Sequence, residues 1–152
     1  MALGVIANLT SCSATDSEDK TTYDQEKPTI EDSEQSTPTD CQQFMRGESI
    51  KFRYTFADNV ELGNFNIEIH NNFDHHTHST SAADCQMEAI KPPENPWVYN
   101  QDHSIDPGLK KFEANIEIPI PYNVDPGDYH FMIRVTDRAG WQTLKAISVK
   151  IL

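Results

Sequence analysis

The chain is poor in positive charge. Its 152 residues include 12 Lys and Arg against 24 Asp and Glu, which gives a formal net charge of -12, and no part of the sequence forms a basic cluster. Nucleic acids and anionic lipid surfaces are bound mainly through clustered Lys and Arg. We therefore expect no nucleic-acid partner and no electrostatic attachment to membranes. An acidic chain with six histidines is, however, compatible with cations.

The sequence also lacks several signatures of membrane proteins and enzymes. No apolar run approaches the roughly 20 residues that a bilayer-spanning helix needs. There is neither a Gly-rich phosphate-binding loop nor an HExxH zinc-protease motif. A zinc hydrolase would also need a pocket, an open coordination position and a general base, for which Glu68 and Asp74 are nominal candidates. We expect a protein that is not an enzyme.

The first residues resemble part of an export signal. In "MALGVIANLTSC", Leu9 lies three positions before Cys12 with small residues between them, as at the end of a bacterial lipoprotein signal. Residues 1–12 are then expected to be the remnant of that signal, with Cys12 lipidated. There is no basic region before the apolar run, so the alternatives are a start set at an internal methionine and a short buried strand or helical turn.

Residues 13–27 are polar and acidic without periodicity, which predicts a flexible tether between a lipid anchor and a folded domain. From residue 13 to residue 40 there are nine acids against two lysines, so this part carries -7 of the net charge. A stretch of acidic residues just after a lipidated cysteine resembles the export signal of Bacteroidetes-type lipoproteins. That likeness implies an outer membrane lipoprotein of the cell envelope, exposed at the surface and held to the membrane only through its lipid.

The cysteines are few. With Cys12 assigned to lipid, Cys41 and Cys85 remain as an even pair in a chain expected to mature outside the reducing cytosol. We predict a Cys41–Cys85 disulfide, whose loop of about 43 residues would contribute about 4 kcal/mol on the chain-entropy model. Two buried thiols are the alternative. No second close cysteine pair gives the spacing of a zinc ribbon.

From residue 28 to residue 152 the apolar residues alternate with period two, and the connections are rich in Pro, Gly, Asn and Asp. This pattern is typical of an all-β fold. About seven strands are expected, including short ones near 28–31 and 97–100, which suggests an immunoglobulin-like antiparallel β-sandwich over residues 28–152. In "DPGDY", Tyr129 follows a Pro-Gly turn at the start of the penultimate strand and resembles a tyrosine corner.

The stretch "IEIHNNFDHHTHST", residues 67–80, holds four of the six histidines. In an immunoglobulin-like order the strand at 64–70 lies beside the strand at 128–136. His70 and His130 both alternate away from the core, so they can point from one sheet face about 5 Å apart, or about 7 to 8 Å if diagonal. The two imidazoles are then close enough to share one ion.

The loop after His70 supplies the remaining candidates. His76 and His78 share a face if the loop is extended, whereas His75 then points the other way and Asp74 could orient a ligating histidine without touching the ion. Zinc takes imidazole in tetrahedral geometry, and copper or nickel also accept it. His103, in "NQDHSIDPG", has no evident strand partner and is treated as a surface residue. The candidate metal ligands are His70, His76, His78, His130, His75 and Asp74.

Three segments together, "FADNVEL", "IEIHNNFDHHTHS" and "GDYHFMIRVTDRAGW", with the lipobox-like start, resemble the Bacteroidetes lipoprotein domain-of-unknown-function family 4625. The resemblance covers roughly residues 28–152. It implies an immunoglobulin-like fold and a cell-envelope address, and it implies no activity.

Two functions from different classes follow from these patterns. The first is a surface lipoprotein that binds a transition metal, zinc foremost, and presents the metal or a metal-bearing ligand to an outer-membrane importer. The second is an immunoglobulin-like adhesion or assembly module, in which exposed aromatics (Trp97, Tyr99 and Trp141) contact a glycan or a protein. For the histidines themselves, a loop held by histidine–carboxylate hydrogen bonds and a pH-responsive surface are further alternatives.

Overall fold

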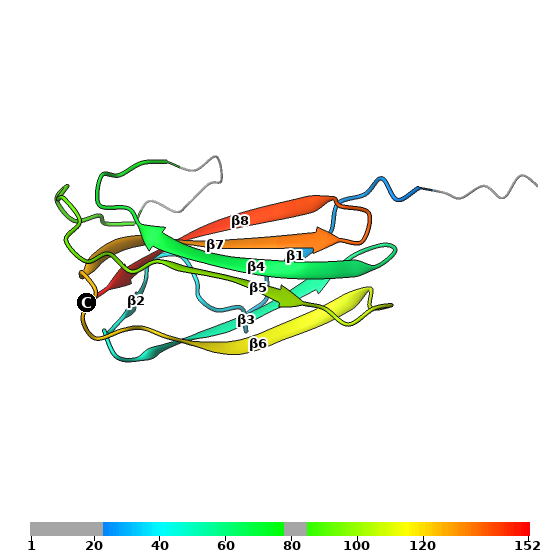
Figure 1. Cartoon of the computed structure of the whole chain (residues 1–152), viewed down its shortest axis with the longest axis horizontal. Helices are drawn as coiled ribbons and strands as arrows, with labels where there is room; N and C mark the ends of the chain where they lie inside the picture. Colours follow the sequence, from blue (N-terminus) through cyan, green and yellow to red (C-terminus); the bar gives the residue numbers. More distant parts are fainter. Residues whose placement is uncertain (1–22, 78–84) are drawn as a thin grey trace, which may run out of the picture.

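A computed structural model describes residues 23–77 and 85–152 of the chain. These residues form eight strands and no helix, arranged as two packed sheets (Figure 1). The all-β sandwich expected from the sequence is confirmed. Cys12, within residues 1–22, and His78, within residues 78–84, lie outside the described residues. The strands are β1 (Thr29–Glu31), β2 (Gln42–Phe44), β3 (Ser49–Ala57), β4 (Leu62–Asn71), β5 (Tyr99–Ser104), β6 (Lys111–Pro119), β7 (Gly127–Asp137) and β8 (Gln142–Ile151).

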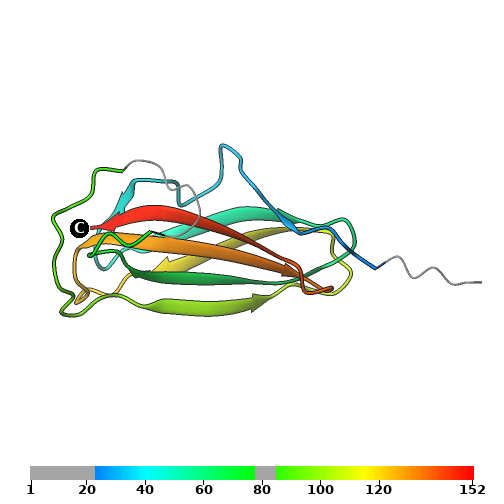
Figure 2. The same cartoon turned by 90° about the horizontal axis from the view of Figure 1, so that it is seen from above.

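One sheet has three strands in the order β1-β3-β6, and the other has five in the order β2-β8-β7-β4-β5. Seen from above, β8, β7, β4 and β5 lie side by side in one layer (Figure 2). The predicted pairing of β4 with β7 is therefore correct. Every pairing within the sheets is antiparallel except that of β2 with β8, which is parallel.

The expected strand list was wrong in two places. β2 was missed because "QQF" is too short to show alternation, and its strand character comes from pairing with the end of β8. The strand expected at 97–100 begins at Tyr99 and runs to Ser104. Its sequence, "YNQDHS", is polar because it lies at the edge of the five-stranded sheet. A strand at the edge of a sheet can carry polar residues along most of its length. The alternation of apolar and polar residues therefore does not reveal it.

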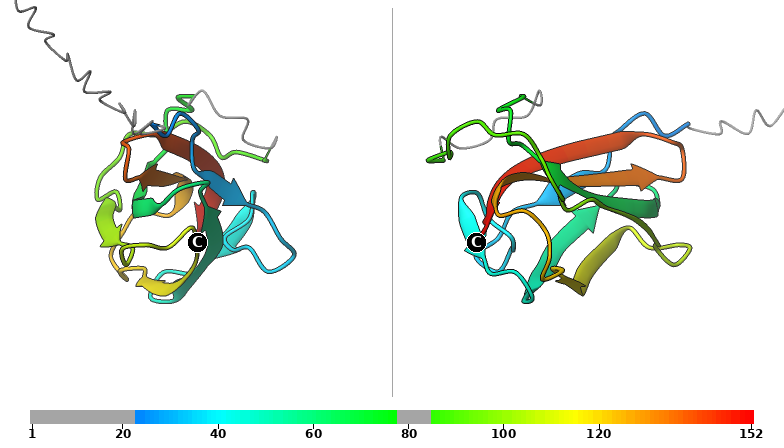
Figure 3. Two further views of the ribbon diagram at one scale, coloured as in Figure 1. Left: turned by 90° about the vertical axis from the view of Figure 1, so that its right-hand side faces the viewer. Right: turned by 60° about the vertical axis from the view of Figure 1, so that its left-hand side comes forward.

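The two sheets face each other in the end-on view (Figure 3, left), and the buried side chains of the core lie between them. Alternate residues of β3, including Phe52 and Phe56, are fully buried, and the Phe52 ring stacks on Phe131 of β7 with 5.9 Å between centroids. Full burial of an aromatic or branched aliphatic side chain contributes about 1.5–3 kcal/mol each. This packing fixes which residues of β4 and β7 face inward, and so which face outward.

Tyr129 forms the predicted tyrosine corner. Its hydroxyl donates to the carbonyl oxygen of Asp125 at 2.7 Å and accepts from the backbone N–H of Trp97 at 3.1 Å. Trp97 is only 5% exposed, so it is a core residue and not the exposed binding aromatic that the sequence suggested. The corner fixes the start of β7, where His130 lies.

The predicted disulfide is present. Cys41 and Cys85 are joined with 5.3 Å between their Cα atoms. The backbone N–H of Cys41 donates to the carbonyl oxygen of Ser148 at 2.8 Å, which ties this cysteine to β8. The segment that starts at Cys85 is thereby held beside the five-stranded sheet.

None of the described residues belongs to a helix that could cross a membrane.

Candidate metal centre

His70 of β4 and His130 of β7 are direct cross-strand partners. Their chain neighbours Ile69 and Phe131 are fully buried in the core between the sheets, so the two histidines point to the outer face of the five-stranded sheet. The alternation argument from the sequence therefore placed this pair correctly. His130 is nevertheless only 4% exposed, which means that something covers the outer face here.

The cover includes the loop that follows β4. Phe73 is buried and packs edge-on against Tyr129, with 5.3 Å between centroids, and its neighbour Asn72 donates from N–H to the carbonyl oxygen of Asp128 at 2.8 Å. At His75 the backbone is left-handed, with φ of 58°. This turn brings His76 over the sheet, where its carbonyl oxygen lies 3.1 Å from Nε2 of His130.

Gly127 makes room for this arrangement. Its φ is +131°, and a Cβ built there would lie 2.9 Å from the Phe73 ring. A side chain at this position would both strain the backbone and displace Phe73. The glycine at the start of β7 is thus part of what seats the histidine loop.

Three imidazole rings converge as a result. The centroid distances are 5.5 Å for His70–His76, 5.4 Å for His70–His130 and 5.0 Å for His76–His130. With zinc–nitrogen bonds of about 2.0–2.1 Å and a ring centroid about 1.1 Å beyond the nitrogen, imidazoles arranged tetrahedrally on one ion have centroids about 5 Å apart. The spacing of all three pairs matches this value. We refer to His70, His76 and His130 as the histidine cluster.

Carboxylates lie behind two of the rings. Nδ1 of His76 is 2.5 Å from Oδ1 of Asp74, and Nδ1 of His70 is 3.1 Å from Oε1 of Glu68. The first contact is a hydrogen bond, whereas the second has ion-pair distance without hydrogen-bond alignment. The hydrogen-bonded carboxylate of Asp74 keeps the ring proton of His76 on Nδ1 and puts the lone pair on Nε2, the arrangement common in histidines that ligate zinc.

The third ring has the opposite assignment. Nε2 of His130 faces the carbonyl oxygen of His76, and a carbonyl oxygen can only accept, so Nε2 carries the proton and Nδ1 the lone pair. The hydrogen bond from His76 also lowers the pKa of the Asp74 carboxyl below its ordinary value. Asp74 therefore remains ionised and supports the ring, as the sequence suggested for it.

The other histidines lie elsewhere. His75 contacts the carbonyl oxygen of Glu88 through Nε2 at 2.8 Å, so it points away from the cluster, in line with its lower rank as a ligand. His103 is not in a loop: it belongs to β5, is the cross-strand partner of Phe65 and stacks on that ring at 4.7 Å. The predicted ligand His78 lies outside the described residues.

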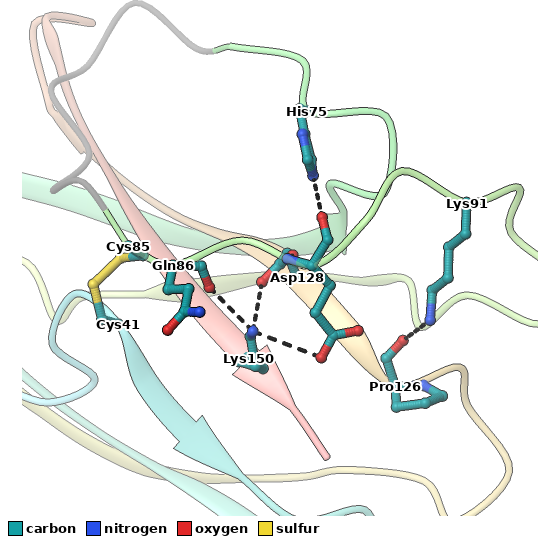
Figure 4. A network of polar contacts seen from close by, with 9 residues as sticks. Cys41, His75, Cys85, Gln86, Lys91, Pro126, Asp128 and Lys150 are labelled. Atoms are coloured by element: carbon teal, nitrogen blue, oxygen red, sulfur yellow. Dashed lines mark hydrogen bonds and ion pairs between the residues drawn. A yellow bond between two sulfur atoms is a disulfide. The ribbon is translucent and has the colours of Figure 1, made fainter.

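A strap that sequence reasoning missed holds this region together (Figure 4). It consists of residues 85–91, and the segments after β4 and before β5 both lie at this end of the sandwich (Figure 3, right). Lys150 of β8 donates to the carbonyl oxygen of Gln86 at 3.1 Å and lies 3.6 Å from Oε1 of Glu88. Lys91 donates to the carbonyl oxygen of Pro126 at 2.5 Å. Only the disulfide prediction hinted that a segment is fixed here.

The comparison with known families gives one match. The model of a family described as a domain of unknown function, DUF4625, matches residues 10–152. The chain belongs to the DUF4625 family. Among curated proteins, none matches it. The description of DUF4625 carries no activity, so the function has to be argued from the side chains.

The histidine cluster of this DUF4625 domain combines three imidazole rings with two nearby carboxylates. Asp74 lies beside the ring of His76 and Glu68 beside that of His70, and the third ring lies on the buried start of β7. Two of the three rings come from neighbouring strands and one from a loop anchored at Phe73.

Proposed function

We propose that this DUF4625 domain binds one transition-metal ion, zinc foremost, through His70, His76 and His130. The observation that carries the proposal is the mutual spacing of the three rings, 5.0 to 5.5 Å. Imidazole nitrogens suit zinc, copper and nickel, whereas calcium and magnesium prefer oxygen. The ligand atoms would be Nε2 of His70, Nε2 of His76 and Nδ1 of His130.

Three protein ligands leave one position of a tetrahedral ion for a further donor. His78 is the ligand that the sequence predicts for this position, and water or a small metal-bearing ligand is the other source. The charges also favour the ion: the carboxylates of Glu68 and Asp74 balance a divalent cation locally, and the chain as a whole carries -12. Net negative charge raises the local concentration of cations.

We place this function at the cell envelope. The lipobox-like residues 1–12 support a lipid anchor on Cys12 at the outer membrane, and the Cys41–Cys85 disulfide is typical of compartments outside the reducing cytosol. The protein would then present zinc, or a ligand that carries it, to an outer-membrane importer. A role as an adhesion or assembly module without metal has less support, since Trp97 of its three candidate aromatics is buried.

Calorimetric titration of the full chain with zinc tests the proposal. We expect one site with sub-micromolar affinity in the wild type and no binding in a His70→Ala/His130→Ala double variant. His103→Ala is the matched control, because His103 lies in the same sheet but outside the cluster. Zinc at 100 times its Kd should stabilise the wild type by about 2.7 kcal/mol and leave the double variant unchanged. An isotherm that survives in the double variant would contradict the proposal.

A further inference from the structure

A second group of candidate ligands lies at the other end of the sandwich. Asp24 precedes β1, Asp58 follows β3 in the turn toward β4, and Asp137 ends β7. Each offers one carboxylate oxygen, and the three oxygens lie within 4.8 Å of one another. In Figure 1 the turns after β3 and β7, which hold Asp58 and Asp137, lie at the opposite end of the sandwich from the end of β4, which holds His70. We call Asp24, Asp58 and Asp137 the aspartate cluster.

Burial of Asp137 distinguishes the aspartate cluster from an ordinary group of acidic surface residues. The residue is 4% exposed, and its Oδ1 accepts from the backbone N–H groups of Gly140 at 2.6 Å and Trp141 at 2.8 Å. Its Oδ2 is buried and has no hydrogen-bond partner within the described part of the chain. A buried carboxylate oxygen without a donor is costly, so such atoms call for a bound ion or another explanation.

Asp58 repeats the pattern. Its Oδ2 accepts from the N–H groups of Val60 at 2.8 Å and Glu61 at 2.7 Å, which shapes the turn after β3. Its Oδ1 is buried and, among residues 23–77 and 85–152, has no partner. Two turns of separate strand pairs thus each use one carboxylate oxygen locally and leave the second oxygen buried without a partner among the described residues.

The basic side chains nearby are engaged with other groups. Arg138 contacts Oε1 of Glu61 at 3.2 Å, and Lys110 donates to the carbonyl oxygen of Asn59 at 2.8 Å. In the part of the chain that the structure describes, no ion pair joins a Lys or Arg to the aspartate cluster. Three like charges at this distance repel one another, and a cation would relieve the repulsion.

We propose that Asp24, Asp58 and Asp137 bind a calcium ion. An all-oxygen donor set selects hard cations and disfavours zinc and copper. Calcium accepts six to eight oxygens in irregular geometry, whereas magnesium demands a near-ideal octahedron, and three carboxylates from three separate segments suit the more tolerant ion. Water would complete the coordination. With three protein carboxylates we expect a Kd of about 10⁻⁴–10⁻³ M, the range of extracellular calcium modules.

Calcium at the aspartate cluster would have a structural role. Asp24 lies in the segment that leads into β1, and its carbonyl oxygen accepts from Nε1 of Trp141 at 2.9 Å. The ion would connect this segment to the β3–β4 and β7–β8 turns. Calcium would therefore fix the direction in which the N-terminal part of the chain leaves the domain.

Trp141 can report ion binding at the aspartate cluster by fluorescence. The chain has two tryptophans, and Trp97 is buried beside Tyr129 at the start of β7, whereas Trp141 contacts Asp24. Terbium bound at the aspartate cluster should give emission sensitised by Trp141, and calcium should displace it. Trp141→Phe should lose the sensitised emission. Absence of sensitised emission from the wild type, together with a melting temperature that millimolar calcium leaves unchanged, overturns the proposal.

Aspartate variants localise the ion. Asp58→Asn and Asp137→Asn keep the oxygen that accepts from the turn and remove one negative charge. We expect calcium affinity to fall at least tenfold in each, while the melting temperature without calcium stays equal or rises. Asp24→Asn tests the same point at a residue that lies outside the strands. Exposed Glu117→Gln on β6 is the charge-matched control and should respond as the wild type.

Two comparisons distinguish calcium binding at the aspartate cluster from calcium binding at the histidine cluster and from a proton shared by the carboxylates. The His70→Ala/His130→Ala variant should keep its full calcium response. Calcium stabilisation that is equal in wild type, Asp58→Asn and Asp137→Asn overturns the proposal. So does a protein that is stabilised by acid and unaffected by calcium, since the carboxylates would then hold a proton between them.

Discussion

His70 and His130 face each other across the β4–β7 ladder with 5.4 Å between their ring centroids. The ladder fixes this relationship, because Ile69 and Phe131 beside them are fixed in the core. The third ring, His76, comes from a loop. A metal bound by the cluster would therefore find two ligands on rigid strands and a third whose position depends on Phe73 and on the strap formed by residues 85–91.

The carboxylates behind the rings should tune metal affinity. Asp74→Asn removes the charge that holds the proton on Nδ1 of His76, and Glu68→Gln removes the negative charge 3.1 Å from Nδ1 of His70. Loss of such a supporting partner typically weakens metal binding 10- to 100-fold. We expect this loss in each variant, with one zinc still bound, when zinc is titrated against a chromophoric chelator. Glu117→Gln should bind as the wild type, and wild-type affinity in Asp74→Asn would show that Asp74 only shapes the loop.

The tyrosine corner should matter for stability and not for metal affinity. Tyr129→Phe removes the hydrogen bond to Asp125 and leaves the buried N–H of Trp97 without its acceptor. An unsatisfied buried group costs about 1–3 kcal/mol, so the free energy of unfolding in urea should fall by that amount. Phe73 still packs on the ring, and zinc affinity should change less than threefold. Exposed Tyr122→Phe should change stability by less than about 0.5 kcal/mol.

The disulfide should support both stability and the site. A Cys41→Ser/Cys85→Ser variant is expected to lose about 2–4 kcal/mol of unfolding free energy. It also releases the start of the strap, whose Glu88 carbonyl holds His75 next to the proposed ligand His76. We therefore expect zinc affinity to fall severalfold in the folded variant, measured by the same chelator competition. Unchanged affinity would mean that Lys150 and Lys91 are sufficient to hold the strap.

The part of the candidate site that could be predicted from the sequence is the part made by strands. Alternation put His70 and His130 on one outer face, and the immunoglobulin-like order made their strands neighbours. Tyr129 was found in the same way, because a Pro-Gly turn before a strand fixes the corner. Strand periodicity and turn chemistry are local properties, so they can be detected without the rest of the fold.

Other features depend on contacts between distant segments. The position of His76 follows from the burial of Phe73 against Tyr129 and from the left-handed backbone of His75, neither of which has a periodic signal. His103 was assigned to a loop because an edge strand such as β5 carries polar residues on its exposed side. The aspartate cluster joins two turns and the segment before β1, and no spacing in the sequence indicates that they meet.

Alkaline pH should destabilise the fold through Tyr54. This residue is 2% exposed, and its hydroxyl donates to the carbonyl oxygen of Pro38 at 2.6 Å. Burial, and to a lesser extent the charges of Asp32 and Asp40, raise the pKa of Tyr54 well above its usual value. An unfolded tyrosine loses its proton near pH 10, so above that pH the unfolded chain binds fewer protons than the folded one, and stability falls as pH rises.

The stabilisation from the protonated Tyr54 is therefore complete below about pH 10 and is lost progressively above it. Tyr54→Phe should cost about 0.5–1.5 kcal/mol at pH 7, through loss of the hydrogen bond to Pro38. Its stability should then decline less steeply between about pH 10 and pH 11 than that of the wild type. A smaller decline should remain, because burial also raises the pKa of Tyr129. Urea midpoints measured across this range decide the matter, and equal slopes in the two proteins would show that Tyr54 is not the titrating group.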